Sequence, residues 1–453
     1  MRRVVITGVG AVSPHGIGTA PFWNGLLEGK SSITALTRFD PSAFESRVAG
    51  VVPEFKTTDF VPKSYRKSTK IMAHDIELAV VAADFAVRDA RLITKGIADP
   101  ESPLEAQLLA QGWSKPDPAR VGCNIGAGLI SANLDELTAA VAEVRNPDNT
   151  MNLARWGRSE DPTKPSGMDH LTPLWLLKYL PNMLSCHVSI IHDTQGPSNT
   201  ITCAQASAGL AIAEAARTIQ RNQADLALAG GCESKVHPMG LMRWSLLGRL
   251  NGKSNDNPGA ACRPYDRDAA GAVLAEGGAV FVLEELEHAR KRGATIYAEL
   301  AGFGSTASAS RSPIDPDPSG EAPAMAIKKA FRDAGISPDH VDLICSSGYA
   351  VPDWDRSDVN TLRIAFGQTL AKTALLPARA GIGDCGAGSQ ALDIAAAALA
   401  MHQQTIPPAV NCPHPVANLP INQQKKTGSL QHALVISVAL GGQNSAIVLR
   451  RAT

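Results

Sequence analysis

The sequence predicts an α/β fold built from two halves of similar layout. A strand leads into a helix of small residues twice, once from residue 200 and once from residue 380. Each half then closes with a Gly-Gly turn and a β-branched strand, EGGAVFVL in the first half and GGQNSAIVL in the second. Such a duplication predicts two similar α/β layers that meet at a pseudo-twofold axis, with the functional site between them. We place the halves at residues 1–290 and 291–453.

The composition excludes several classes of function. The 453 residues contain 43 Lys+Arg and 43 Asp+Glu, so no strong field favours nucleic acid or an anionic membrane. No stretch approaches the ~18–20 apolar residues of a membrane span, and the N-terminal run MRRVVITGVG is too short for a signal peptide. The eight cysteines show no CxxC pair and no metal-ligand spacing. We therefore expect a cytoplasmic protein without a bound metal.

Periodicity and Gly/Pro punctuation predict alternating strands and helices along both halves. We expect strands over residues 4–8, 121–125, 200–202, 226–229, 279–283, 296–304, 341–345, 433–438 and 445–449. We expect helices over residues 71–92, 133–144, 172–187, 284–292, 322–334, 355–366 and 388–403. The helix over 172–187 is apolar on most faces, which is typical of a helix inside a protein or between subunits. Residues 146–171 are polar without an apolar period and predict an excursion loop.

The stretch GPSNTITCAQASAGLAIAEAARTIQRNQADLALAGGCE, residues 196–233, is the candidate site. It predicts a strand, a tight turn at Cys203-Ala204-Gln205 and a helix that opens on small residues. A turn of this kind exposes one side chain and two or three free backbone N–H groups at a helix N-terminus. This arrangement suits a nucleophile or an oxygen atom that carries negative charge, and Cys203 is the obvious nucleophile.

Several segments together carry a family resemblance. They are VVITGVGAVSPHG, QGPSNTIT, ADLALAGGCES, RPYDRDAAG, AEGGAVFVLEE, AELAGFGS and GGQN, in this order. In order and spacing the chain resembles the β-ketoacyl-ACP synthases of the thiolase superfamily over essentially its whole length. The resemblance implies a five-layer αβαβα thiolase-like fold. It also implies a nucleophilic Cys at the turn and two His from the second half, which condense an acyl chain with malonyl-ACP.

The spacing places another residue where the family has its nucleophile. Counted from Gly196 and back from Gly230, the family's Cys position falls on Gln205. Cys203 lies two residues earlier, roughly 6–7 Å along a strand. We therefore expect Cys203 to be a buried strand residue.

The two histidine positions are also changed. In the segment that resembles the family's HGTGT motif, Ser347 occupies the His position, and Tyr349 and Val351 replace two threonines that usually hold the pantetheine arm. In the KSxxGH-like segment, Arg379 stands at the lysine and Asp384 at the histidine. In the loop resembling GFGGTN, Leu440 takes the place of a phenylalanine and precedes Gly441, Gly442 and Asn444.

These substitutions predict a degenerate site. A Gln amide forms no acyl-enzyme, and Ser347 and Asp384 cannot supply two neutral imidazole donors to an enolate. Gln at the Cys position without the histidines resembles the chain-length-factor, or ketosynthase β, subunits of type II polyketide systems. That resemblance implies pairing with an active ketosynthase around an acyl tunnel. It implies no cofactor, because the acyl-phosphopantetheine of the carrier protein is the carried substrate.

Two alternatives stay open. One is an acyltransferase or malonyl-ACP decarboxylase that uses Cys203, or the oxyanion N–H groups of Gln205 and Leu440. The other is a non-catalytic homodimer that binds an acyl chain or carrier protein. The basic residues of PKSYRKSTK match the place where family members dock acyl carrier protein, although a solvated helix start explains them equally well. These residues are Lys63, Arg66, Lys67 and Lys70.

Overall fold

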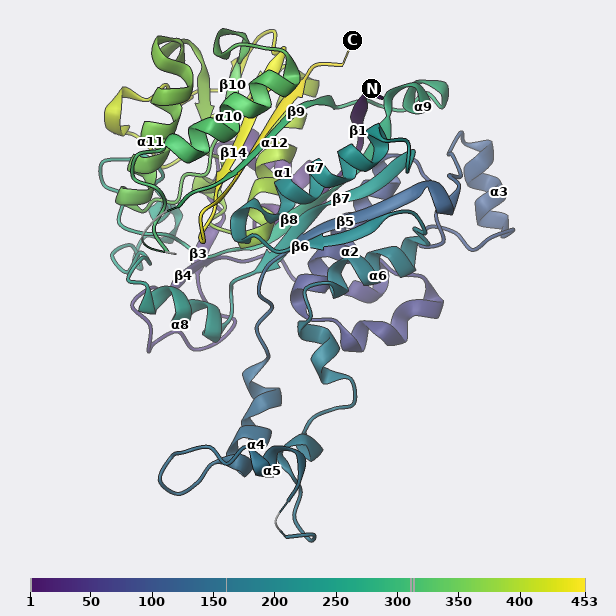
Figure 1. The fold of residues 1–453 in the computed structure, drawn as a ribbon, viewed down its shortest axis with the longest axis vertical. Coiled ribbons are helices and arrows are strands. Elements are labelled where there is room, and N and C mark those ends of the chain that lie inside the picture. The colour runs from purple at the N-terminus through teal and green to yellow at the C-terminus, as the bar shows by residue number, and fades with distance from the viewer. Residues whose placement is uncertain (1, 160, 310–311, 313, 453) are drawn as a thin grey trace.

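The computed structural model describes residues 2–159, 161–309, 312 and 314–452 (Figure 1). Its strands are β1 Val4–Ser13, β2 Gly16–Ile17, β3 Ile33–Ala35, β4 Val48–Gly50, β5 Val121–Ala127, β6 Ser198–Ile201, β7 Leu226–Ser234, β8 Glu276–Glu285, β9 Ala298–Ala307, β10 Leu343–Cys345, β11 Ala374–Leu376, β12 Thr405–Ile406, β13 Lys426–Thr427, β14 His432–Val438 and β15 Gln443–Arg450. Its α-helices are α1 Thr19–Leu27, α2 His74–Asp89, α3 Pro103–Ala110, α4 Leu134–Val144, α5 Ala154–Gly157, α6 Met183–His192, α7 Ser207–Gln220, α8 Pro238–Leu246, α9 Leu286–Lys291, α10 Glu321–Ala334, α11 Pro352–Phe366 and α12 Ser389–Gln403.

The strand order confirms the duplicated α/β layout. The first half runs β1-β8-β7-β5-β6 and the second half β9-β15-β14-β10-β11. In both halves the second strand of this order is antiparallel to its neighbours, and the last three strands are parallel to one another. β1 and β9 meet through Val5↔Glu299 and Ile6↔Ala298, which joins the halves into one sheet.

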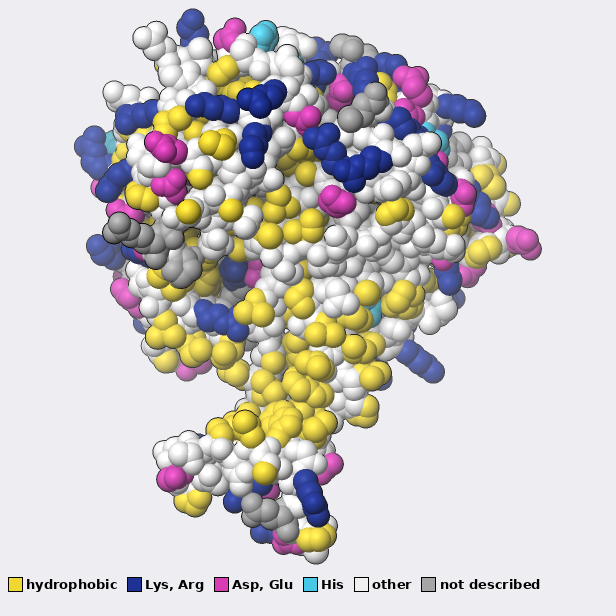
Figure 2. Space-filling view, viewed as in Figure 1, with side chains coloured by type: hydrophobic (Ala, Val, Ile, Leu, Met, Phe, Trp, Pro, Cys, Tyr) yellow, Lys and Arg dark blue, Asp and Glu magenta, His cyan; other side chains and the backbone are white. Residues whose placement is uncertain are grey.

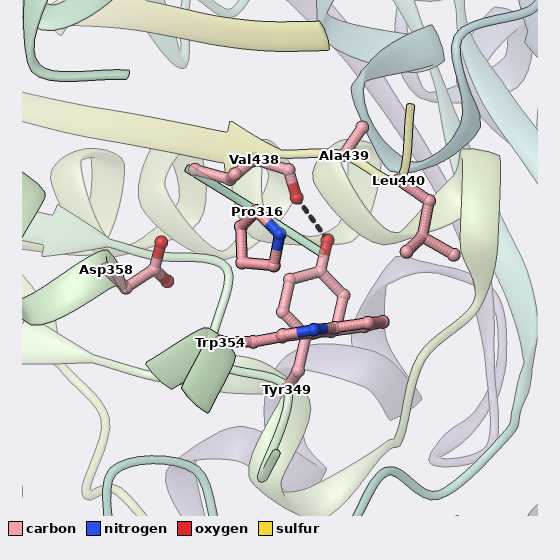
Figure 3. A pocket seen from close by; sticks show the side chains of 7 residues that line it. All are labelled: Pro316, Tyr349, Trp354, Asp358, Val438, Ala439 and Leu440. Carbon is pink, nitrogen blue, oxygen red and sulfur yellow. Dashed lines mark hydrogen bonds between the residues drawn. The ribbon is translucent and has the colours of Figure 1, made fainter. Parts of the chain in front are cut away.

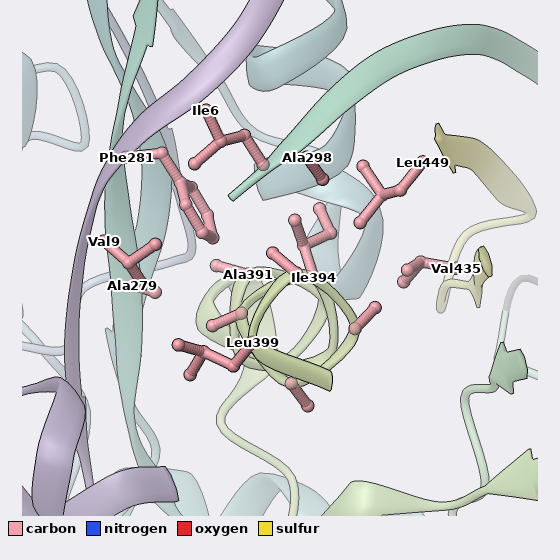
Figure 4. Close-up of a cluster of buried hydrophobic side chains, with 14 of the residues drawn as sticks. Ile6, Val9, Ala279, Phe281, Ala298, Ala391, Ile394, Leu399, Val435 and Leu449 are labelled. Carbon is pink, nitrogen blue, oxygen red and sulfur yellow. The ribbon is translucent and has the colours of Figure 1, made fainter. Parts of the chain in front are cut away.

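Helices complete a five-layer αβαβα arrangement, as the resemblance implied. α2 and α6 cover the outer face of the first half, and α10 covers that of the second. α7 and α12 lie between the halves. α12 reads SQALDIAAAALAMHQ, and its small side chains are buried along most of its length. Figure 4 shows it packed against β1 and β8 on one side and β9, β14 and β15 on the other.

An arm projects from the body between β5 and α6 (Figure 1). We define it as residues 134–179, which hold α4, α5 and the 3-10 helices η4 Gly167–His170 and η5 Trp175–Tyr179. The excursion loop predicted over residues 146–171 therefore contains two short helices, α5 and η4. Residue 160 of this predicted loop lies outside the described residues. Glu136 of α4 accepts hydrogen bonds from Lys178 and from the Tyr179 hydroxyl, which ties the two ends of the arm together.

The single helix predicted over 172–187 is wrong. Residues Trp175–Tyr179 form η5, and α6 begins only at Met183. Pro181 lies in the gap between them, and a proline has no N–H to continue a helical ladder. The helices α1, α3 and α8 were not predicted, and α3 and α8 begin with proline at their first turn. In the described part of the chain, no helix is both long and apolar enough for a membrane span.

Candidate functional site

The turn after β6 directs one side chain into the interior. Ala204 has a left-handed backbone (φ 46°), and residues Ala204–Ala206 form the short helix η6 that leads into α7. The Ser207 hydroxyl fixes this turn, because it accepts the Cys203 N–H (2.7 Å) and donates to the Ala204 carbonyl (2.7 Å). Gln205, between them, is completely buried.

The Gln205 amide bridges two other segments of the chain. Its Nε2 donates to Asp384 Oδ2 (3.0 Å), and its Oε1 accepts the Leu440 N–H (3.3 Å). Its backbone carbonyl accepts the Ser437 hydroxyl (3.1 Å). Since the Leu440 N–H can only donate, the amide oxygen faces it and the NH₂ group faces Asp384. The backbone donor at Leu440 is thus already occupied by an oxygen from within the chain.

Asp384 is held at the start of the central helix. Its Oδ1 accepts from the Gly386 N–H (3.1 Å) and the Ser389 hydroxyl (2.9 Å), where Ser389 is the first residue of α12. The carboxylate therefore links Gln205 to the N-terminus of a helix, where negative charge is favoured. The sequence analysis names Gln205, Asp384 and Leu440 as site residues, and in the structure the Gln205 amide bonds to each of the other two.

Ser347 is buried but serves another contact. Its hydroxyl accepts the Val438 N–H (2.9 Å) and donates to the Ile436 carbonyl (3.4 Å). These bonds connect the segment after β10 to β14, beside Ser437. Ser347 therefore supports β14, whose Ser437 bonds to the Gln205 backbone carbonyl. Its own hydrogen bonds do not reach the Gln205 amide.

Arg379 forms a buried ion pair. Its Nη2 lies 2.8 Å from Asp393 Oδ2, and its guanidinium carbon lies 5.3 Å from the centre of the Tyr349 ring. Burial raises the pKa of the Asp393 carboxyl to about 6, against the opposing effect of Arg379. At the predicted lysine position, Arg379 is therefore paired with the Asp393 carboxylate and lies over the Tyr349 ring.

Aromatic side chains fill the approach beside Leu440 (Figure 3). The Tyr349 hydroxyl donates to the Val438 carbonyl, and its ring meets Trp354 edge-on at 5.0 Å. Trp354 in turn packs on Trp244 at 5.7 Å. The cavity that remains here measures about 10 Å³, room for about one water molecule. A thioester arm could reach Gln205 from this side only if these side chains moved.

The glycine hairpin carries the Leu440 donor. Gly441 and Gly442 both have positive φ angles (86° and 85°), which lets β14 turn back into β15. Asn444 lies past the turn, and its Nδ2 donates to Ser308 Oγ (3.0 Å) and to the Gly442 carbonyl (3.2 Å). Asn444 thus braces the hairpin.

An ion pair beside the site escaped the sequence analysis. Lys235 Nζ lies 3.0 Å from Glu233 Oε1, and Glu233 Oε2 accepts the Ala387 N–H (2.6 Å). Burial lowers the pKa of Lys235, but Glu233 and Asp384 outweigh burial and raise that pKa above its ordinary value. The signal available in the sequence was the spacing Glu-x-Lys at the end of a strand, which places both side chains on one face.

The prediction that Cys203 is a buried strand residue is wrong. β6 ends at Ile201 because the chain turns there toward η6, so Cys203 lies two residues past the strand and is half-buried. Burial raises the pKa of its thiol. A raised thiol pKa reduces the fraction of the nucleophilic thiolate.

The four basic residues predicted for carrier docking lie together on the 3-10 helix η2, Lys63–Ile71, where all four are exposed. In the described part of the chain, no group of three His, Cys, Asp or Glu side chains could hold a metal ion.

Comparison with known proteins identifies the family. Residues 1–289 match the profile described as β-ketoacyl synthase, N-terminal domain, and residues 297–413 match the C-terminal domain. The chain belongs to the β-ketoacyl synthase family. It is 32% identical to 3-oxoacyl-[acyl-carrier-protein] synthase 2 of Coxiella burnetii, covering 99% of both chains. It is 29% identical to the mitochondrial 3-oxoacyl-[acyl-carrier-protein] synthase of Arabidopsis thaliana, covering 99% of this chain and 93% of that protein.

Solved structures of ketosynthases share the fold. A type II polyketide synthase acyl-carrier protein in complex with its ketosynthase matches with a TM-score of 0.79 and 26% identity, covering 100% of both chains. The ishigamide ketosynthase/chain length factor matches with a TM-score of 0.80 and 24% identity, again over 100% of both chains. At that identity the second match bears on the fold alone. The thiolase-like architecture expected from the sequence is therefore confirmed.

Proposed function

We propose that this chain is a β-ketoacyl synthase subunit that does not condense acyl chains by itself. It pairs with an active ketosynthase in a type II fatty acid or polyketide system and shapes the acyl tunnel, as a chain length factor does. One observation carries the proposal. The buried Gln205 amide, bonded to Asp384 and to the Leu440 N–H, stands where an active family member needs a free thiolate and an open oxyanion donor.

Reconstitution tests this role. The purified chain, incubated with acyl-ACP and malonyl-ACP, is expected to give no condensation product. Co-expression with the host's ketosynthase, whose catalytic Cys and two His are intact, is expected to give a complex that forms the condensation product. Mutating that partner's Cys to Ala is the matched control and should abolish the product. If the chain alone condensed these substrates, and Gln205→Ala stopped it, the proposal would be wrong.

The alternative acyl-transfer role makes a different prediction. Intact-mass spectrometry after incubation with acyl-ACP would show an acyl adduct that Cys203→Ala removes. We expect no adduct, because the Cys203 thiol has a raised pKa and is half-buried. A stoichiometric adduct on Cys203 would instead favour an acyltransferase.

We also propose that the basic helix η2 docks acyl carrier protein. The ammonium groups of Lys67 and Lys70 are exposed there, and a carrier protein is acidic. Lys67→Glu with Lys70→Glu should weaken carrier binding to the assembled pair about tenfold or more at low salt, measured by fluorescence polarisation. The exposed Lys425 and Lys426, changed in the same way, provide the control. Unchanged affinity in the η2 variant would leave these lysines as a solvated surface.

A further inference from the structure

A lysine is buried beside the closed site. Lys and Arg side chains are spread over the surface in Figure 2, where water stabilises their charge. The side chain of Lys235, which directly follows β7, is only 16% exposed. Burial lowers the pKa of Lys235, but the carboxylates of Glu233 and Asp384 outweigh burial and raise that pKa. Arg379 also interacts with Asp384, but its guanidinium bonds directly to Asp393 (3.1 and 2.8 Å).

Lys235 packs against the turn that carries Asp384. Its Nζ lies 3.0 Å from Glu233 Oε1, and Glu233 Oε2 accepts the Ala387 N–H (2.6 Å). A Cβ on Gly386 would lie 2.5 Å from Lys235 Cε, so the lysine side chain lies directly against this glycine. The Gly386 N–H in turn donates to Asp384 Oδ1 (3.1 Å). The lysine is therefore held on the same turn as the Asp384 carboxylate.

The charge of Asp384 decides how the Gln205 amide is oriented. An ionised carboxylate only accepts hydrogen bonds, and the NH₂ group of Gln205 donates to Asp384 Oδ2 (3.0 Å). The amide oxygen is then left to accept the Leu440 N–H (3.3 Å). A protonated Asp384 would donate to that oxygen instead, and the amide would turn its NH₂ group toward Leu440, where two donors would meet. The Leu440 N–H therefore keeps its acceptor only while Asp384 is ionised.

We propose that Lys235 is a positioning residue that keeps the Leu440 donor covered. Its ammonium stabilises the Asp384 carboxylate, because a buried charge is costly unless an opposite charge compensates it. The carboxylate fixes the Gln205 amide, and the amide oxygen covers the Leu440 N–H. This inference rests on the proposed function only for what a covered donor means, which is a site closed to substrate.

Hydrogen exchange at the Leu440 N–H tests this role in the full-length chain. Two-dimensional NMR of protein labelled with ¹⁵N at Leu and Val follows Leu440 together with Val438. The Val438 N–H bonds to Ser347 Oγ (2.9 Å) and is the reference on the neighbouring strand residue. Lys235→Met should speed exchange at Leu440 about tenfold or more relative to Val438. Lys328→Met removes an exposed charge on α10 and, as the control, should change neither rate.

A second substitution shows whether Lys235 acts through Asp384. The uncharged side chain in Asp384→Asn does not need the ammonium, so adding Lys235→Met should leave exchange at Leu440 as it is in Asp384→Asn alone. A further acceleration in the double variant would contradict the inference. If Lys235→Met alone does not fold, as judged by circular dichroism, adding Asp384→Asn should restore a folded chain. A double variant that also fails to fold overturns the role through Asp384.

The remaining outcomes separate this inference from the proposed function. A folded Lys235→Met variant with wild-type exchange at Leu440 overturns the inference. Equal acceleration at Leu440 and Val438 also overturns it, because the loosening would then be general. Neither result touches the pairing with an active ketosynthase, since these measurements use no partner and no substrate. Condensation by the purified chain alone would overturn the proposed function, and exchange at Leu440 would still decide whether Lys235 keeps the donor covered.

Discussion

At the scale of the residue, the amide of Gln205 satisfies two partners of opposite kind. Asp384 presents an oxygen that accepts, and Leu440 presents an N–H that donates. Among uncharged side chains, an amide offers both a donor and an acceptor at this reach, whereas a thiol offers only weak ones. Gln205 and Asp384, which we predict to stand at the family's Cys and second His positions, therefore complement each other.

Two substitutions of Gln205 test this complementarity. Gln205→Ala leaves the Asp384 carboxylate and the Leu440 N–H without their partner, which should lower the free energy of unfolding by about 1–3 kcal/mol. Gln205→Glu should be the less stable variant at pH 8, because it brings two carboxylates together and removes the NH₂ donor. Urea unfolding of each purified variant measures both effects.

The exposed Gln107 on α3 supplies the control, because its replacement by alanine should change stability by less than about 0.5 kcal/mol. A Gln205→Glu variant as stable as the wild type would show that the contact between Gln205 and Asp384 does not stabilise the fold.

At the scale of the element, the hairpin between β14 and β15 sets the position of the Leu440 donor. Gly441 and Gly442 have nearly the same left-handed backbone, but their surroundings differ. A Cβ on Gly441 would meet open space, whereas a Cβ on Gly442 would lie 2.6 Å from the Ser308 carbonyl oxygen.

Alanine substitutions at Gly441 and Gly442 separate the effect of backbone strain on stability from the effect of steric overlap. Gly441→Ala should lower the free energy of unfolding by about 1–2 kcal/mol, because only the left-handed backbone conformation disfavours alanine there. Gly442→Ala should cost more, because the hairpin must also move away from Ser308. Urea unfolding of the two variants gives the comparison. Equal losses would mean that the hairpin moves away from Ser308 at no cost in stability.

The turn that carries Gln205 recurs in the second half. The Cys203 N–H donates to Ser207 Oγ, and the Cys385 N–H donates to Ser389 Oγ (2.9 Å) four residues later in the same way. The second residue of each turn is left-handed, with φ 46° at Ala204 and 55° at Gly386. The two turns start α7 and α12, so the duplication visible in the strand order extends to the site.

At the scale of the whole molecule, α12 makes the halves interdependent. It belongs to the second half but packs on β1, β7 and β8 of the first. Ala391, Ile394 and Leu399 lie in one core cluster with Phe281 of β8 and Leu449 of β15. Neither half could keep this core without the other.

We therefore expect the two halves to unfold together. In urea, far-ultraviolet circular dichroism and tryptophan fluorescence should follow a single transition with the same midpoint. Because Trp23 lies in the first half and Trp354 in the second, fluorescence reports on both. Two separated transitions would show that the halves are independent folding units.

The layout of the fold follows largely from local sequence. Strands with β-branched residues, helices of small residues and glycine turns occur in the same order in both halves, and the structure has them in that order. The prediction of one helix over residues 172–187 was wrong because it followed the run of apolar side chains and ignored the break that Pro181 makes. The cap prolines of α3 and α8 were likewise too weak a local signal.

By itself, the sequence determined which residue types stand at the site. The count from Gly196 and Gly230 predicts that Gln205 stands at the family's Cys position, and the motif spacing predicts that Ser347 and Asp384 stand at the two histidine positions. Only the tertiary structure decided how these residues are used. Gln205 and Asp384 bond to each other, while Ser347 bonds to β14. Hydrogen bonds depend on distance and direction between segments far apart in the chain, and no spacing along one segment contains that information.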